Sequence, residues 1–119
     1  MIENERRVRR SNVPTVALQC LLEAQKSRAS LDAISIADKD GFLVASASSA
    51  SFDCEVLAAV APNVASGGHG IDSYNRETVS VVPFEVSGQT LYVAMRGGDR
   101  SMYSLVAKLG AEGAKRILS

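Results

Sequence analysis

The 119-residue chain has no net charge, because 13 lysine and arginine residues balance 13 aspartate and glutamate residues. No overall field therefore draws it to nucleic acid or to acidic membranes, and we expect neither as a partner. It also lacks an apolar run of about 18 residues, which argues against membrane insertion. Its charged N-terminus lacks the apolar segment of a secretion signal. We therefore expect a cytoplasmic protein.

Residues suited to metal binding or nucleophilic chemistry are scarce. Cys20 and Cys54 are the only cysteines, and their apolar neighbours predict two buried, reduced thiols rather than a disulfide. His69 is the only histidine and lies in a glycine-rich loop, where an exposed loop residue is expected rather than a metal ligand. No G-x-S-x-G elbow and no phosphate-binding loop is present. We therefore expect no catalytic residue, no metal and no cofactor, and a protein that is not an enzyme.

The segment Asp38-Lys39-Asp40-Gly41 places two aspartates beside a glycine. It could be a metal loop, a catalytic carboxylate pair or a turn. In an EF-hand alignment the first and last ligand positions would be Ile36 and Ala47, which excludes calcium. Acid–base catalysis needs a cleft that a hairpin tip seldom supplies. The sequence favours a turn, since Asp begins turns and Gly provides a positive φ.

Hydrophobic patterning predicts one domain at 13–119, preceded by a basic leader at 1–12 that is either solvated or a frayed helix turn. The leader contains Arg6, Arg7, Arg9 and Arg10. Helices are expected at 13–28, with Asn12 as N-cap, at 53–65, and at 100–118 after the cap Asp99, although 101–107 also alternates like a strand. Strands are expected at 31–37, 42–46, 70–75, 78–86 and 90–95. The order α-ββ-α-βββ-α predicts an α/β sandwich with a five-stranded antiparallel sheet between helices.

The helix at 53–65 is unusual because its segment 56–65, VLAAVAPNVA, is apolar nearly all round. A surface helix ordinarily has one apolar stripe and one polar face. A single sheet covers only one side of such a helix, so a second chain is the natural candidate to cover the other. Pro62 is expected to end or kink the helix near Ala61.

Three stretches taken together resemble the roadblock/dynein light chain family. They are IADKDGFLVASA at 36–47, D-x-E-x-L-A-A at 53–59, and GQTLYVAMRGGDRS at 88–101. The predicted element order is that of the family, and the resemblance spans about 13–118. It implies a non-enzymatic dimerisation module that serves as a platform for Ras-like small GTPases in motility and cell polarity systems. Some bacterial members stimulate GTP hydrolysis by their partner, and an arginine finger from Arg76, Arg96 or Arg100 is an open alternative.

By position, the resemblance implies a dimer through the central helix and the strand at 70–75, which would join two chains in one sheet. The implied interface residues are Phe52, Val56, Leu57, Val60, Val64, Ile71 and Tyr74. The expected partners are a second copy of the chain and a Ras-like GTPase, with a second roadblock protein as the alternative to the homodimer. Pro83 lies in a strand that the family places inside the sheet, so we expect a bulge or an end of pairing there.

A sheet between helices is also the layout of PAS-like and profilin-like sensor domains. A small-molecule sensor is therefore the alternative function. It would need a pocket between the sheet and a helix, with a few polar groups converging on it. The small residues at 45–51 leave room for such a pocket.

Overall fold

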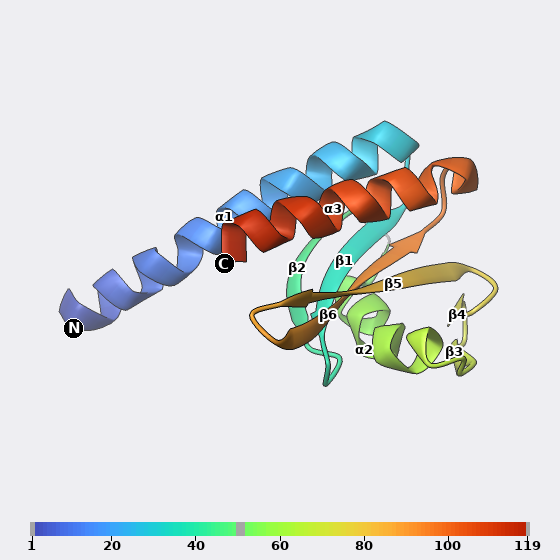
Figure 1. The fold of residues 1–119 in the computed structure, drawn as a ribbon, viewed down its shortest axis with the longest axis horizontal. Helices are drawn as coiled ribbons and strands as arrows, with labels where there is room; N and C mark the ends of the chain where they lie inside the picture. The colour runs from blue at the N-terminus through green and yellow to red at the C-terminus, as the bar shows by residue number, and fades with distance from the viewer. Residues whose placement is uncertain (1, 50–51, 119) are drawn as a thin grey trace.

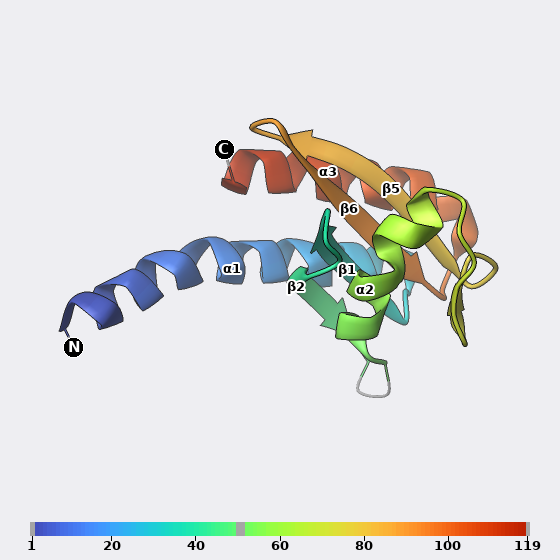
Figure 2. The same ribbon diagram turned by 90° about the horizontal axis from the view of Figure 1, so that it is seen from below.

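The computed structural model describes residues 2–49 and 52–118, with residues 2–13 described by their backbone only. The elements are α1 (Ile2–Ala29), β1 (Ala33–Asp38), β2 (Leu43–Ser48), α2 (Cys54–Ala65), β3 (Gly70–Ile71), β4 (Tyr74–Asn75), β5 (Val79–Val86), β6 (Gln89–Arg96), a 3-10 turn at Arg100–Met102, and α3 (Tyr103–Leu118). An antiparallel sheet in the order β2-β1-β6-β5 separates α1 and α3 on one face from α2 on the other (Figures 1 and 2). The predicted α/β sandwich is confirmed.

The two faces of the sheet carry side chains of different size. Strand alternation directs Ile34 and Met95 toward α1 and α3, in a cluster that also contains Leu18, Leu22 and Val106. The opposite face of the sheet is lined largely by small residues, which pack against Leu57, Ala58 and Ala61 of α2: Ala33, Ala37 and Ala94. Because these side chains are short, the α2 backbone lies close to the sheet.

Both main hairpins turn through local chemistry, and the sequence predicts the first of them. The Asp38 carboxylate accepts hydrogen bonds from the backbone N–H groups of Asp40 (2.9 Å) and Phe42 (3.0 Å), and Gly41 has a φ of +84°. Asp38 to Gly41 is therefore a turn, as expected. The β5–β6 hairpin closes through Ser87 and Gly88, both with positive φ.

The predicted fifth strand at 70–75 is not part of the sheet. Its residues form β3 and β4, a separate two-stranded ribbon in which Gly70 pairs with Asn75 and Ile71 with Tyr74. The chain reverses at Asp72, whose φ is +48°, and the Asn75 side-chain amide donates to the Asp72 carbonyl at 2.6 Å. These local hydrogen bonds close the ribbon on itself, so the sheet has four strands and not five.

The helix α1 differs from the prediction at its start and in its buried face. It begins at Ile2 and continues through Pro14, so Asn12 is not its N-cap and the basic segment expected as a leader has helical backbone. Glutamate and arginine, which predominate before Pro14, favour helix. Cys20 is exposed, and the prediction that it is buried was wrong. Cys20 lies two residues, about 200° around the helix, from the buried Leu18.

Pro83 causes no bulge. The register between β5 and β6 runs without a shift from Val79–Arg96 to Val86–Gln89, with Pro83 opposite Tyr92. The expectation of a bulge was wrong because β5 is an edge strand of the four-stranded sheet, where a missing N–H is tolerated. An irregularity occurs instead between β1 and β2, at Ile36 and Ala37.

The last helix follows the prediction closely. Asp99 caps it, because its carboxylate accepts from the Ser101 backbone N–H at 3.0 Å and from the Ser101 hydroxyl at 2.6 Å. Residues 100–102 form a 3-10 turn and α3 follows directly, which excludes the alternative of a strand at 101–107.

Candidate interaction surface

The helix α2 is continuous and capped at both ends. The Asp53 carboxylate accepts from the backbone N–H groups of Glu55 (3.0 Å) and Val56 (3.2 Å). Pro62 lies inside the helix, which continues to Ala65, so the expected end near Ala61 was wrong. Backbone N–H groups of residues 66–68 bond to carbonyls of residues 62–64 and close the last turn beyond the proline.

One side of α2 packs on the sheet, and the other side is open. Leu57, Ala58, Val60 and Ala61 are buried. The remaining apolar residues are half-buried or exposed in the chain as described: Cys54, Val56, Ala59, Pro62, Val64 and Ala65. In Figure 2 the helix lies across the near face of the sheet, with α1 and α3 behind. The outer side of α2, away from the sheet, therefore carries half-buried and exposed apolar residues, interrupted by the exposed Glu55 and Asn63.

The seven predicted interface residues divide into two groups. Leu57 and Val60 have exposed fractions of 0% and 2%, so they belong to the interior of the chain and support the helix from below. The sequence could not separate the buried from the accessible residues, because a helix that is apolar all round does not show which of its sides faces the sheet. The other five are accessible: Phe52, Val56, Val64 and Tyr74 are half-buried, and Ile71 is 55% exposed. We call these five residues the α2 surface.

The β3–β4 ribbon is bonded to both ends of α2. At the C-terminal end, the Gly70 backbone N–H donates to the Asn63 side-chain oxygen at 3.0 Å. At the N-terminal end, the Asp53 backbone N–H donates to the Tyr74 hydroxyl at 2.9 Å. The ribbon thus carries Ile71 and Tyr74 beside the helix, although it does not extend the sheet.

Arg96, at the end of β6, lies between two aromatic rings of the α2 surface. Its guanidinium carbon is 4.7 Å from the Phe52 ring centroid and 5.5 Å from that of Tyr74. Its Nε donates to the Ser73 carbonyl at 3.4 Å, and Nη1 lies 3.7 Å from the Asp32 carboxylate. Only 19% of the side chain is exposed. Arg96 is therefore held inside the structure and is not a free arginine finger.

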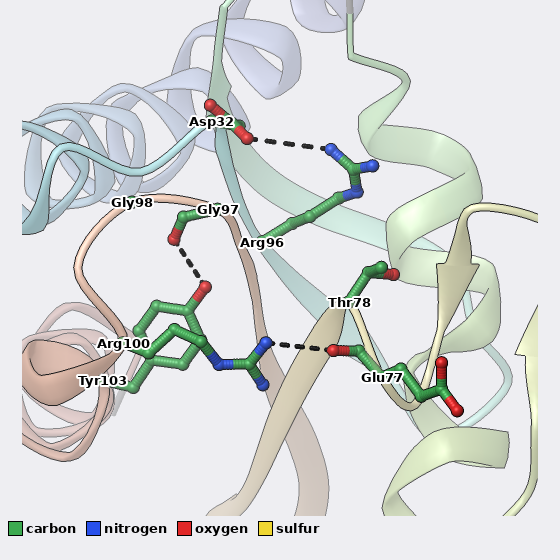
Figure 3. Close-up of a pocket in the computed structure, with 8 residues that line it drawn as sticks. All are labelled: Asp32, Glu77, Thr78, Arg96, Gly97, Gly98, Arg100 and Tyr103. Atoms are coloured by element: carbon green, nitrogen blue, oxygen red, sulfur yellow. Dashed lines mark hydrogen bonds and ion pairs between the residues drawn. The ribbon is translucent and has the colours of Figure 1, made fainter.

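A cavity of about 250 Å³ lies at the same end of the sheet (Figure 3). Its lining residues are Asp32, Glu77, Thr78, Arg96, Gly97, Gly98, Arg100 and Tyr103. Arg100 Nη1 donates to the Glu77 carbonyl at 2.9 Å, and the Tyr103 hydroxyl donates to the Gly97 carbonyl at 2.5 Å. Burial raises the pKa of Tyr103 above its ordinary value. Both arginines are engaged, Arg96 with the Asp32 carboxylate and Arg100 with the Glu77 backbone carbonyl, so neither guanidinium is left free to bind a ligand in the cavity.

The remaining chemistry-bearing residues do not converge. His69 is exposed, and both cysteines are free thiols, with Cys54 half-buried. Across residues 14–49 and 52–118, no three His, Cys, Asp or Glu side chains gather as a metal site would require. Nor does this part of the chain contain a helix long and apolar enough to cross a membrane. Of the three arginines considered as a finger, Arg76, beside the ribbon, and Arg100 are exposed, and Arg96 is half-buried.

An antiparallel sheet with one helix on one face and a helix pair on the other is the roadblock fold that the sequence resemblance predicts. No protein-family model and no curated protein matches the chain. Solved structures of MglB share the fold. Myxococcus xanthus MglB has a TM-score of 0.61 and 17% identity over 87% of this chain and 89% of that one. The gliding protein MglB from Thermus thermophilus has a TM-score of 0.59 and 16% identity over 87% and 90%.

A third structure, MglB with a tetrameric arrangement, has a TM-score of 0.64 and 17% identity over 87% of this chain and 89% of that one. At these identities the similarity establishes the fold, and the roadblock fold is confirmed.

Proposed function

We propose that the chain is a non-enzymatic, homodimeric regulator or scaffold that binds a Ras-like small GTPase in cell polarity, motility or signalling. The observation that carries the proposal is the group of accessible apolar residues on the outer side of α2, which continues through Phe52 and the β3–β4 ribbon. A contiguous apolar surface of this kind is typical of protein interfaces. The fold shared with MglB, one structure of which has a tetrameric arrangement, supports self-association.

Stimulation of GTP hydrolysis is proposed to work by positioning the GTPase's own residues. Two of the three candidate arginines support this view, because Arg96 is enclosed and Arg100 is bonded to the Glu77 carbonyl. An arginine finger must reach into the partner's active site with a free guanidinium. Arg76 stays the accessible alternative, and its substitution by alanine separates the two mechanisms in a hydrolysis assay.

The homodimer is tested by the mass of the protein in solution at micromolar concentration, measured by light scattering on a sizing column. We expect twice 12.6 kDa for the natural chain and 12.6 kDa for Val56→Asp, which places a charge on the α2 surface. Val60 is unsuitable for this test because it is buried and its substitution would unfold the chain.

Val16→Asp is the matched control, since Val16 is 55% exposed but lies on α1, across the sheet from α2. It should leave the dimer intact. A monomeric natural chain, or dissociation by Val16→Asp alone, would contradict the proposed interface. If the dimer is found, the same preparation is assayed with candidate Ras-like GTPases for binding and GTP hydrolysis. A failure to bind any of them while the dimer persists would refute the GTPase partner but not the dimer.

A further inference from the structure

We propose that Arg96 is a positioning residue that sets the geometry of the α2 surface and thereby the affinity of the dimer. The inference rests on the proposed function, because it assigns a role within the same interface. Arg96 lies beneath this surface, contacts two of its five residues, Phe52 and Tyr74, and is itself four-fifths buried.

Arg96 joins segments that are far apart in the chain. Phe52 precedes α2, Ser73 lies at the tip of the ribbon and Tyr74 begins β4, and Asp32 precedes β1. The backbone of Arg96 is itself fixed at the end of β6, where it pairs with both Ala33 and Val79. The guanidinium therefore fastens the separate elements of the surface to the sheet.

The ribbon needs such a connection because its own pairing is short. β3 and β4 contain two residues each, and a two-stranded ribbon of this size is not stable alone. The Asn63 side chain holds the Gly70 end of the ribbon. At the tip, Arg96 Nε and the Thr78 hydroxyl both donate to the Ser73 carbonyl, and the Asp53 N–H donates to the Tyr74 hydroxyl. Loss of Arg96 should loosen the tip and leave the base in place.

The test compares Arg96→Met and Arg96→Lys with the natural chain. Methionine keeps much of the length of the side chain but has no charge and no donor, and lysine keeps the charge but not the Nε–H that reaches Ser73. Amide hydrogen exchange is measured by NMR at Asp53, whose N–H depends on Tyr74, and at Asp32, whose N–H donates to the Arg96 backbone carbonyl. The dissociation constant is measured by sedimentation.

For Arg96→Met we expect exchange at Asp53 to accelerate about tenfold or more while exchange at Asp32 stays unchanged, and the dissociation constant to rise about tenfold. For Arg96→Lys, both the exchange rate at Asp53 and the dissociation constant should lie between the values of the natural chain and those of Arg96→Met. The control is Arg100→Met, which removes a neighbouring arginine that lies over Tyr103 and bonds to the Glu77 carbonyl rather than to the α2 surface. Arg100→Met should change neither the exchange rate at Asp53 nor the dissociation constant.

Faster exchange at Asp53 with an unchanged dissociation constant would overturn the proposal, as would equal weakening by Arg100→Met. If Arg96→Met does not fold, the proposal is tested on Arg96→Lys, by the exchange rate at Asp53 and the dissociation constant. A natural chain that is monomeric throughout would refute the proposed function and with it the effect on affinity. Exchange at Asp53 would then still show whether Arg96 holds the ribbon.

Discussion

Gln25 shows how a single buried atom can weaken this fold. The residue lies on the inner side of α1 with an exposed fraction of 4%, and within the described chain its Oε1 is buried without a hydrogen-bond partner. A buried oxygen that loses its water without gaining a donor raises the free energy of the folded state.

Gln25→Met should therefore raise the free energy of unfolding by about 1 kcal/mol, because the volume is kept and the unpaired oxygen is removed. Urea denaturation measures the change. Gln19→Met, at an exposed position of the same helix, is the control and should have little effect. A loss of stability in Gln25→Met would show that Gln25 makes a favourable interaction in solution.

Tyr103 gives the fold a dependence on alkaline pH. Burial raises the pKa of its hydroxyl, so the folded chain retains a proton that the unfolded chain releases from about pH 10. The stability associated with this group is therefore present below pH 10 and is lost as the pH rises toward the folded-state pKa.

Tyr103→Phe should be less stable near neutral pH, because the bond to the Gly97 carbonyl is lost, but should lose less stability between about pH 8 and pH 11. Denaturant unfolding at both pH values measures the difference, and parallel losses in the two proteins would contradict this assignment.

Arg96 marks the limit of what the sequence could predict at single residues. Strand alternation places Arg96 on the same face of the sheet as Tyr92 and Ala94, toward α2, and this alternation can be read from the sequence. Its contacts were not predictable, because Phe52 and Tyr74 reach it from segments 44 and 22 residues away along the chain. The sequence therefore left Arg96 open as one of three candidate arginine fingers, whereas the structure encloses it.

At the scale of elements, the turns and helix caps that depend on neighbouring residues were predictable from the sequence. The Asp38–Gly41 turn and the Asp99 cap depend on neighbouring residues, and both form as expected. The ribbon at 70–75 was mistaken for a sheet strand because its length and composition allow extension, while the hydrogen bonds that fold it back involve side chains. Its position beside α2 depends on tertiary contacts that no local pattern encodes.

The start of α2 offers a test at this scale. Asp53→Ala removes the carboxylate that accepts from the Glu55 and Val56 N–H groups, and should lower the free energy of unfolding by about 1 kcal/mol. Asp53→Asn keeps an accepting oxygen and should recover most of the loss. Thermal unfolding followed by circular dichroism measures both. Equal stability of the alanine and asparagine variants would exclude a contribution from the cap.

For the whole molecule, the proposed dimer makes stability depend on concentration. Only the folded chain presents the α2 surface, so association should stabilise folding and raise the melting temperature as protein concentration increases. Val56→Asp should melt at a temperature independent of concentration. Calorimetry over a hundredfold range of concentration, about 1 to 100 μM, tests this. A melting temperature that is constant for the natural chain would argue for a monomer.

The central position of β1 also determines when the chain can fold. β1 lies between β2, which follows it directly, and β6, whose residues pair with it from about 60 positions later. Until β6 has left the ribosome, one edge of β1 has no partner and its apolar side chains have no complete core. Closing so long a loop is slow, and the incomplete chain exposes strand edges to other chains. Folding of the sheet must therefore finish after β6 has been synthesised, which makes protection of the segments before β6 a requirement of its production in the cell.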